Sequence, residues 1–134
     1  MNFLHTAADP NDAKIKADLP TFLLIGATKC GTTSLHDWLS RHPQVFIHPW
    51  KEMRFFLDNG NWRRGLSWYA QRFADRGDVL AWGEASNGYT RGSEYAHAPR
   101  RIAETLPCAR FVYVIRDPMA RLVSHYLHRL ATRR

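Results

Sequence analysis

Two groups of residues in this chain have the types and spacing needed to bind an anion. The first is the segment "GATKCGTTS", residues 26–34, in which Gly26 and Gly31 flank Lys29. A glycine-containing connection between a strand and a helix lets backbone N–H groups converge on an anion, and the positive helix N-terminus adds to the attraction. Lys29 supplies a mobile positive charge. Hydroxyl donors follow at Thr32, Thr33 and Ser34. The segment predicts an anion-binding loop, and a glycine turn capped by threonine is the structural alternative.

This loop departs from the pattern of nucleotide-hydrolysing P-loops, which is G-x-x-x-x-G-K-[ST]. Gly26 and Gly31 have the required spacing, but Thr32 occupies the position of the lysine. A P-loop kinase or nucleotide hydrolase also needs an acidic Mg²⁺ ligand after a strand, and Asp117 is the only good candidate. A kinase or nucleotide hydrolase is therefore a rival interpretation that the loop itself does not favour.

The second group lies in "VIRDPMARLVSHY", residues 114–126. Arg116 ends an apolar run, and Ser124 follows eight residues later, about two turns into the helix expected after Pro118. Both side chains can face one crevice, where arginine holds a phosphate through its planar guanidinium and serine through its hydroxyl. The alternative for Arg116 is an ion pair with Asp117 or with a surface carboxylate.

Apolar runs before each group predict the strands that position them. Residues 21–26, "TFLLIG", are almost continuously apolar, and the run "ARFVYVIRDP", residues 109–118, holds five apolar residues in a row. Continuous rather than alternating apolar strands are typical of a buried parallel sheet. Shorter strands are expected within residues 44–49 and 78–90. Strands that alternate with helices predict an α/β fold, in which both groups lie beyond the carboxyl ends of the strands.

Helices are expected at residues 32–42, near residues 65–75, at residues 94–105 and after Pro118. In the first of these, three apolar residues are spaced to form one buried face, and a proline ends the helix. These residues are Leu35, Trp38, Leu39 and Pro43. Asp117 can cap the last helix, with Pro118 at its first position. The predicted buried stripe of that helix consists of Leu122, Val123, Tyr126, Leu127 and Leu130.

The composition is that of one globular domain with an excess of positive charge. Hydrophobic residues make up 45% of the 134 residues and charged residues 23%, which excludes a wholly disordered chain. Residues 101–134 hold seven arginines and only two acidic residues, so +5 of the net charge of +7 lies there. This skew favours anionic partners, such as phosphorylated small molecules, nucleic acid or sulfated polymers. A solvated basic face is the alternative, and no recognised nucleic-acid-binding module supports a nucleic-acid partner.

The ends of the chain and its cysteines suggest a simple organisation. Residues 1–20 are polar with little periodicity and are expected to form a loose lead-in, followed by one domain over residues 21–134. Two cysteines do not make a disulfide framework, and the first twenty residues do not resemble a signal peptide. No apolar run approaches the roughly 20 residues needed to span a bilayer. We therefore expect a soluble cytoplasmic protein.

Taken together, the two groups resemble the motifs of sulfotransferases that use 3'-phosphoadenylyl sulfate (PAPS). The 5'-phosphosulfate loop of that family resembles "GATKCGTTSL", and its 3'-phosphate motif resembles "YVIRDPMARLVSHY". The segment "KEMRFF", residues 51–56, resembles a segment of the carbohydrate (heparan-type) branch and its bacterial relatives. "GEASNGYT", residues 83–90, is similar to a Gly-Glu-Lys-(Ser/Thr)-Pro-x-Tyr stretch of the same branch.

The resemblance implies a P-loop-like three-layer fold, with a central parallel sheet flanked by helices, and a role for each matching residue. Lys29 would contact the leaving oxygens of PAPS. The cradle of its 5'-phosphate would include Gly26, Cys30, Gly31, Thr32, Thr33 and Ser34. Arg116 and Ser124 would hold the 3'-phosphate. Glu52 would act as general base on a hydroxyl or amine acceptor, with Lys51 polarising the sulfonyl group, and the branch that the chain resembles implies a carbohydrate acceptor. No metal is expected to be required.

The chain also departs from the family pattern in two places. Ala85 and Asn87 occupy the positions of the family's lysine and proline in the second glycine-glutamate stretch. The chain ends at Arg134, shortly after the 3'-phosphate motif, so we expect it to be an N-terminal portion of the family fold. The rival interpretation is a non-catalytic, truncated nucleotide-binding remnant.

Overall fold

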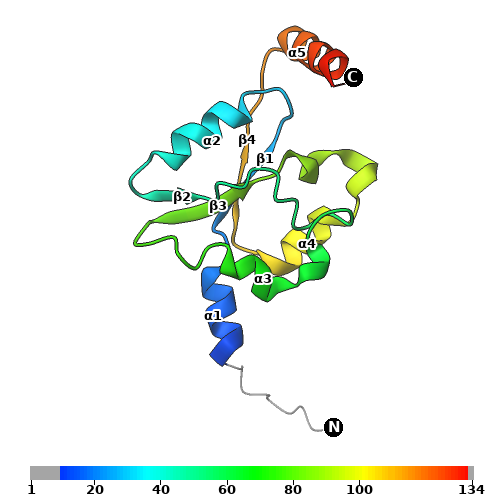
Figure 1. The fold of residues 1–134 in the computed structure, drawn as a ribbon. Helices are drawn as coiled ribbons and strands as arrows, with labels where there is room; N and C mark the ends of the chain where they lie inside the picture. The colour runs from blue at the N-terminus through cyan, green and yellow to red at the C-terminus, as the bar shows by residue number, and fades with distance from the viewer. Residues whose placement is uncertain (1–9, 133–134) are drawn as a thin grey trace.

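The computed structural model describes residues 10–132 and contains one sheet of four parallel strands, in the order β2-β3-β1-β4 (Figure 1). The strands are β1 (Phe22–Gly26), β2 (Val45–Ile47), β3 (Ala81–Ala85) and β4 (Arg110–Tyr113). The α-helices are α1 (Pro10–Asp18), α2 (Thr32–Ser40), α3 (Leu66–Gln71), α4 (Ala98–Thr105) and α5 (Pro118–Ala131). Short 3-10 helices are η1 (Trp62–Arg64), η2 (Asn87–Thr90) and η3 (Gly92–Tyr95). The predicted α/β class and parallel sheet are confirmed.

Alternating residues of β1 enter two separate cores, because successive side chains of a strand point to opposite faces of the sheet. Leu23 belongs to the core that includes α3 and α4, with Tyr69, Phe73 and Ile102. Phe22 and Leu24 belong to a smaller core that also contains Ile47 and Ala85 and takes in the partly buried Leu35 and Leu39 of α2. The sheet is therefore the middle of three layers, as expected from the family resemblance.

The segment after β2 is fixed by burial of its apolar side chains. Met53, Phe55, Phe56 and Leu57 are all buried. The ring of Phe55 stacks on that of Tyr69, with centroids 4.0 Å apart and an interplanar angle of 3°. Close aromatic packing of this kind contributes on the order of 0.5–1.5 kcal/mol beyond the area that it buries. Lys51 and Glu52, which immediately precede this buried segment, are consequently held against the core.

The N-terminal segment is more ordered than the sequence predicted. Residues 10–18 form α1, whereas a loose lead-in was expected over residues 1–20. The carboxylate of Asp18 receives a hydrogen bond from Arg76 at 2.6 Å, and Leu19 is buried. This tertiary contact stabilises a helix whose own sequence has little periodicity. Residues 1–9 of the expected lead-in lie outside the described part of the chain.

Two predictions of buried apolar faces were wrong. All five residues of the predicted stripe on α5 are exposed, and so are Phe111, Tyr113 and Ile115 in and after β4. The reason is topological: β4 is an edge strand, and no helix or strand within residues 10–132 buries these side chains, although Phe111 faces α4 across a cavity. Trp38 is 70% exposed because the side chains of α2 that pack toward the sheet are others, including Leu35, His36 and Leu39. None of the helices described is long and apolar enough to cross a bilayer.

Candidate active site

A cavity of about 430 Å³ lies beyond the carboxyl ends of the strands, where the sequence analysis placed the two anion-binding groups. Its walls come from four segments: the loop after β1 with the start of α2, the segment after β2, the segment after β3, and the chain after β4 with α5. The predicted site residues on its wall are Lys29, Gly31, Thr32, Thr33, Lys51, Glu52, Arg116 and Ser124. Four segments that are distant in sequence therefore converge on one polar cavity, because the parallel strands deliver them to the same edge of the sheet.

The first side of the cavity is the loop between β1 and α2. Gly31 caps α2 in a left-handed conformation, with φ 91°. A side chain at Gly31 would meet no atom within 4 Å, so the glycine is required by backbone conformation rather than by space. At the other end of the loop, a Cβ on Gly26 would lie 2.9 Å from the ring of Tyr113. The two glycines thus set the path of the loop at its entry and its exit.

The loop is fastened to the edge strand and to α5 by hydrogen bonds to its backbone. The backbone N–H of Ala27 donates to the carbonyl of Val114 at 2.9 Å. Arg121 donates to the carbonyl of Thr28 at 3.1 Å, and Arg116 makes a long hydrogen bond of 3.5 Å to the carbonyl of Lys29. The predicted anion-binding groups are therefore in direct contact with each other.

Arg116 and Ser124 both face the cavity, as the two-turn spacing predicted. Asp117 caps α5 by accepting a hydrogen bond from the backbone N–H of Ala120 at 2.8 Å, which confirms its predicted capping role. No ion pair of Arg116 is found within residues 10–132. The alternative in which Asp117 neutralises Arg116 is thereby excluded, and the guanidinium keeps its charge for an anion.

Glu52 is held at the cavity wall in an unusual backbone conformation. Its φ is 61°, and its N–H donates to the carbonyl of Ala85 at 2.7 Å. The carboxylate accepts a hydrogen bond from the backbone N–H of Asn87 at 3.2 Å and lies 3.9 Å from Lys51 and 3.7 Å from Arg54. Both Lys51 and Glu52 are mostly buried, so they are not a solvated surface pair.

Strained backbone is concentrated at this cavity. Lys29, Glu52 and Arg54 are the non-glycine residues with positive φ in the described part of the chain, with φ values of 67°, 61° and 53°. All three line the cavity. A non-glycine residue in this region costs roughly 1–3 kcal/mol and persists where the surrounding structure enforces it, most often at functional sites. The coincidence supports a functional role for these residues.

Beneath the cavity, the carboxylate of Glu84 is completely buried and accepts hydrogen bonds from three hydroxyls. Ser86 donates at 2.6 Å, Tyr69 donates at 3.2 Å, and Tyr89 donates a third, short hydrogen bond. Burial raises the pKa of the Glu84 carboxyl, and the charge of Glu52 acts in the same direction, while the three hydrogen bonds oppose the shift. Burial likewise raises the pKa of both tyrosines well above the ordinary value.

This buried cluster supports the segment that carries Glu52. The hydroxyl of Ser86, which donates to Glu84, also accepts a hydrogen bond from the backbone N–H of Arg54 at 2.9 Å. The backbone N–H of Glu52 donates to Ala85, and that of Arg54 donates to Ser86. Residues 52–54 are therefore held at both ends against the last residue of β3 and the residue that follows it. The glycine-glutamate stretch was predicted only from its resemblance to the family, and the sequence predicted no role for Glu84.

Three predicted residues do not line the cavity, and five others do. Gly26 and Cys30 are buried beside it in the loop, and Ser34 is exposed on α2, so their predicted contacts with a phosphate stay predictions. The residues that the sequence analysis missed are Thr28, Arg54, Asn87, Arg91 and His128. For His128 a signal existed, since it follows Ser124 by four residues and therefore shares its helix face.

The electrostatics of the cavity favour an anion. Its cationic residues are Lys29, Lys51, Arg54, Arg91 and Arg116, and Glu52 is the one carboxylate among its described lining residues. Within residues 10–132, no cluster of three or more His, Cys, Asp or Glu side chains could hold a metal ion. The lysines, the arginine fork and the N-terminus of α2 suit phosphate or sulfate groups.

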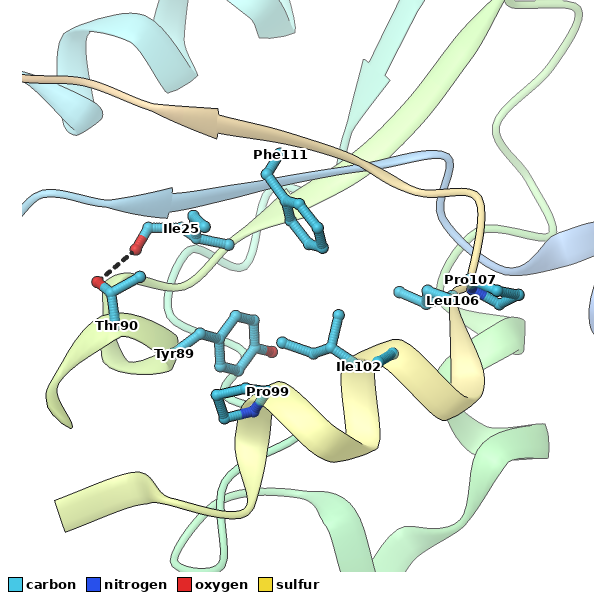
Figure 2. A pocket seen from close by; sticks show the side chains of 9 residues that line it. Ile25, Tyr89, Thr90, Pro99, Ile102, Leu106, Pro107 and Phe111 are labelled. Atoms are coloured by element: carbon cyan, nitrogen blue, oxygen red, sulfur yellow. Dashed lines mark hydrogen bonds between the residues drawn. The ribbon is translucent and has the colours of Figure 1, made fainter. Parts of the chain in front are cut away.

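A second cavity, of about 450 Å³, is apolar and lies on the other side of β1 from α2, between the sheet and α4. Figure 2 shows Ile25 of β1 and Phe111 of β4 facing Ile102 of α4. At one end the hydroxyl of Thr90 donates to the carbonyl of Ile25 at 2.9 Å. With no charged side chain on its described wall, this cavity cannot provide the anion site.

Comparison with known proteins agrees with this geometry. The sequence model described as "Sulfotransferase domain" matches residues 19–133. A membrane-associated sulfotransferase, kil1, from Dictyostelium discoideum is 35% identical over 111 residues, which cover 81% of this chain and 22% of that protein. The human bifunctional heparan sulfate N-deacetylase/N-sulfotransferase 3 is 35% identical over 117 residues, which cover 82% of this chain and 13% of that protein.

A solved structure shows the same fold. The crystal structure of a sulfotransferase from Alicyclobacillus acidocaldarius superimposes with a TM-score of 0.70 and 31% sequence identity, covering 84% of this chain and 50% of that chain. This chain therefore spans half of the bacterial enzyme and less than a quarter of the two curated relatives. The cavity, the sheet and the sequence match lead to one conclusion: the chain belongs to the sulfotransferase domain family.

Proposed function

We propose that this chain binds PAPS in the polar cavity and takes part in transferring its sulfuryl group to a hydroxyl or amine acceptor, with a carbohydrate as the acceptor class. The observation that carries the proposal is the convergence of Lys29, Arg116 and Glu52 on one cavity. Lys29 and Arg116 give two separate cationic positions on the cavity wall, and Glu52 gives a carboxylate on the same wall. The sulfotransferase relatives support the reaction type.

The proposed donor fits the residues on the cavity wall. One anionic end would be held by Lys29, Gly31 and the hydroxyls at the start of α2, where the helix N-terminus adds its positive partial charge. A second phosphate would be held by Arg116 and Ser124. Two phosphate sites on one cavity favour a nucleotide that carries phosphates at both the 5' and 3' positions. PAPS is such a nucleotide, and it supplies the activated sulfuryl group.

The residues around the donor site suit an in-line transfer. In the proposed reaction the acceptor oxygen or nitrogen forms a bond to sulfur while the bond between sulfur and the leaving phosphate oxygen breaks. Glu52 takes the proton that the acceptor loses, and Lys29 stabilises the negative charge on the leaving oxygen. A positioned general base typically contributes on the order of 10²–10⁴-fold to the rate. Lys51, 3.9 Å from Glu52, adds positive charge on the same side of the cavity.

The carbohydrate acceptor class rests on relatives rather than on the cavity. The human relative is named as a heparan sulfate N-sulfotransferase, which supports an amine or hydroxyl on a sugar. Trp50 is partly exposed and packs edge-to-face with Trp68, with ring centroids 6.2 Å apart. Aromatic side chains of this kind provide stacking surfaces for sugar rings, so Trp50 is a candidate acceptor contact.

A P-loop kinase or nucleotide hydrolase is less well supported. Thr32 stands where such enzymes have lysine, and the carboxylate of Asp117 is engaged in capping α5. Titration calorimetry of the chain with adenosine 3',5'-bisphosphate and with ATP plus Mg²⁺ distinguishes a sulfotransferase from a P-loop kinase or nucleotide hydrolase. We expect tighter binding of the bisphosphate. A preference for ATP with Mg²⁺ would contradict the proposal, and bisphosphate binding without transfer to any acceptor would favour the binding-only alternative.

A further inference from the structure

Asn87 lies between the anion-binding loop and Glu52 and contacts both. It is the first residue of η2, is only 7% exposed, and lines the polar cavity. Its backbone N–H donates to Glu52 at 3.2 Å, and its side-chain amide donates through Nδ2 to Thr32 Oγ1 at 3.2 Å. These bonds join segments 35 and 55 residues apart in the chain. One buried residue thus connects the loop that would hold the donor with the carboxylate that would act on the acceptor.

The hydrogen bond to Thr32 determines what the threonine hydroxyl can do. A hydroxyl has one hydrogen to donate and two lone pairs that accept. Because Asn87 Nδ2 donates to Oγ1, the hydroxyl hydrogen of Thr32 is turned away from the amide. No hydrogen bond from this hydroxyl to a protein acceptor is found in the described part of the chain, and Thr32 lines the cavity. The hydrogen is therefore free for an anion, and the bond from Asn87 strengthens it as a donor.

The other end of the amide indicates that Asn87 is not there for stability alone. Its Oδ1 is buried and has no hydrogen-bond partner. A buried unsatisfied acceptor is destabilising, and an apolar side chain of similar shape would remove that penalty. The residue is also one of the two positions where the glycine-glutamate stretch departs from the family pattern. The family pattern has proline at this position, and a proline has no backbone N–H to donate to Glu52.

We propose that Asn87 is a positioning residue for the donor: it orients the Thr32 hydroxyl toward the bound phosphate and holds Glu52 beside the same site. This inference rests on the proposed function, since it takes the anion in the cavity to be the nucleotide. Asn87 acts through Thr32 and Glu52 and needs no contact with the nucleotide itself.

A double-mutant cycle on nucleotide binding tests the Thr32 part of this role. The variants are Asn87→Ala, which keeps the backbone N–H to Glu52, and Thr32→Val, which keeps the shape of Thr32 but removes its hydroxyl. The probe is adenosine 3',5'-bisphosphate, titrated by calorimetry, and thermal melts check that each variant is folded. Asn87→Ala should weaken binding by about 3- to 10-fold. In the Thr32→Val background it should change binding by less than about twofold, because the hydroxyl that it orients is gone.

Asn87→Asp provides a second, independent comparison in case the alanine variant does not fold. Aspartate has nearly the same shape but can only accept, so it draws the Thr32 hydrogen away from the nucleotide. Binding should be weaker in Asn87→Asp than in Asn87→Ala, and Thr32→Val should remove part of the aspartate effect. The negative charge of the aspartate repels a nucleotide whatever the role of Asn87, so the part of the loss that Thr32→Val removes is the diagnostic quantity, and an aspartate effect unchanged by Thr32→Val would contradict the role. Asn59→Ala, at an exposed asparagine outside the cavity, is the matched control.

Each outcome of these titrations bears on a different claim. Equal weakening by Asn87→Ala in the native and Thr32→Val backgrounds, or no weakening in either, would overturn the role of Asn87. If the native chain does not bind the bisphosphate, or binds it equally well after Arg116→Ala, the proposed function fails instead. The two failures are distinguishable because Arg116 has no hydrogen bond to Asn87 or Thr32 among the described residues.

Discussion

The backbone N–H of Glu52 donates a hydrogen bond of 2.7 Å to the carbonyl of Ala85, the last residue of β3. This bond attaches the candidate base to the end of a central strand of the sheet. The hydrogen bond helps to hold Glu52 in a left-handed conformation, with φ 61°, which is unfavourable for a non-glycine residue without such a contact. The candidate base is therefore positioned by a backbone hydrogen bond to a central strand, which allows specific expectations about its substitution.

Glu52→Gln should strongly slow transfer without weakening nucleotide binding. The amide has nearly the shape of the carboxylate but cannot take a proton, so we expect the rate of sulfuryl transfer to fall by about 10²- to 10⁴-fold. Affinity for adenosine 3',5'-bisphosphate should be unchanged or tighter, because a negative charge leaves a cavity that binds an anion. Radiolabelled sulfuryl transfer to a panel of amine- and hydroxyl-bearing oligosaccharides, paired with calorimetry, measures both quantities. Full transfer activity in the variant would remove Glu52 from the proposed mechanism.

The buried carboxylate of Glu84 should make the stability of the chain depend on pH. Its pKa is raised by burial, so the native state binds more protons than the unfolded state at pH values just above the ordinary value of 4.5. The stabilisation is present at lower pH and decreases as the pH rises from 4.5 through the raised pKa. Glu84→Gln lacks this titration and should also lose about 1–3 kcal/mol from the broken hydroxyl cluster. Urea unfolding across that pH range checks both effects, and identical pH profiles would contradict the assignment.

His48 should give the opposite dependence. Burial lowers the pKa of its imidazole, and the charges of Arg72 and His36 act in the same direction. Its Nδ1 accepts a hydrogen bond from the backbone N–H of Trp50 at 3.1 Å, which protonation would break. The native state therefore binds fewer protons than the unfolded state, and stability is lost as the pH falls below the ordinary value of 6.5. His48→Gln should flatten this acid loss in urea unfolding, and an unaltered slope would exclude His48 as its source.

The exposed stripe on α5 should be tolerant to substitution in this chain. Leu127 is 57% exposed, whereas Phe73 is completely buried in the core beneath the sheet. Leu127→Ser should change the free energy of unfolding by no more than about 0.5 kcal/mol. Phe73→Ala should cost about 3–5 kcal/mol. Chemical denaturation of the two variants compares them directly. A large loss in Leu127→Ser would show that the stripe is buried in solution.

The sequence was sufficient to locate the four strands, most of the helices after β1 and the two anion-binding groups. Apolar runs and the Asp117-Pro118 cap predicted β1, β4 and the start of α5, because these signals are local. Parallel strands then required Lys29 and Arg116 to meet at one edge of the sheet. The helix predicted at residues 94–105 is found in part: α4 begins at Ala98, with Pro99 in its first turn, and Gly92–Tyr95 form η3 instead.

Features that depend on tertiary contacts could not be predicted in the same way. The exposure of Leu127 depends on what packs over β4 and α5, and helical spacing alone does not report it. The roles of Glu84 and Asn87 depend on hydrogen bonds to residues 15 and 55 positions away. α1 was missed because its stability comes from the contact between Asp18 and Arg76 rather than from its own periodicity.

The central claim is that Arg116 holds a 3'-phosphate, and one comparison tests it most directly. Affinities for adenosine 3',5'-bisphosphate and for 5'-AMP are measured by calorimetry in the native chain and in Arg116→Ala. Charge-assisted hydrogen bonds contribute about 1.5–3 kcal/mol, so the native chain should prefer the bisphosphate by about tenfold or more. Arg116→Ala should remove that preference by weakening only the bisphosphate. Equal affinities in the native chain, or an equal loss for both nucleotides in the variant, would contradict the account.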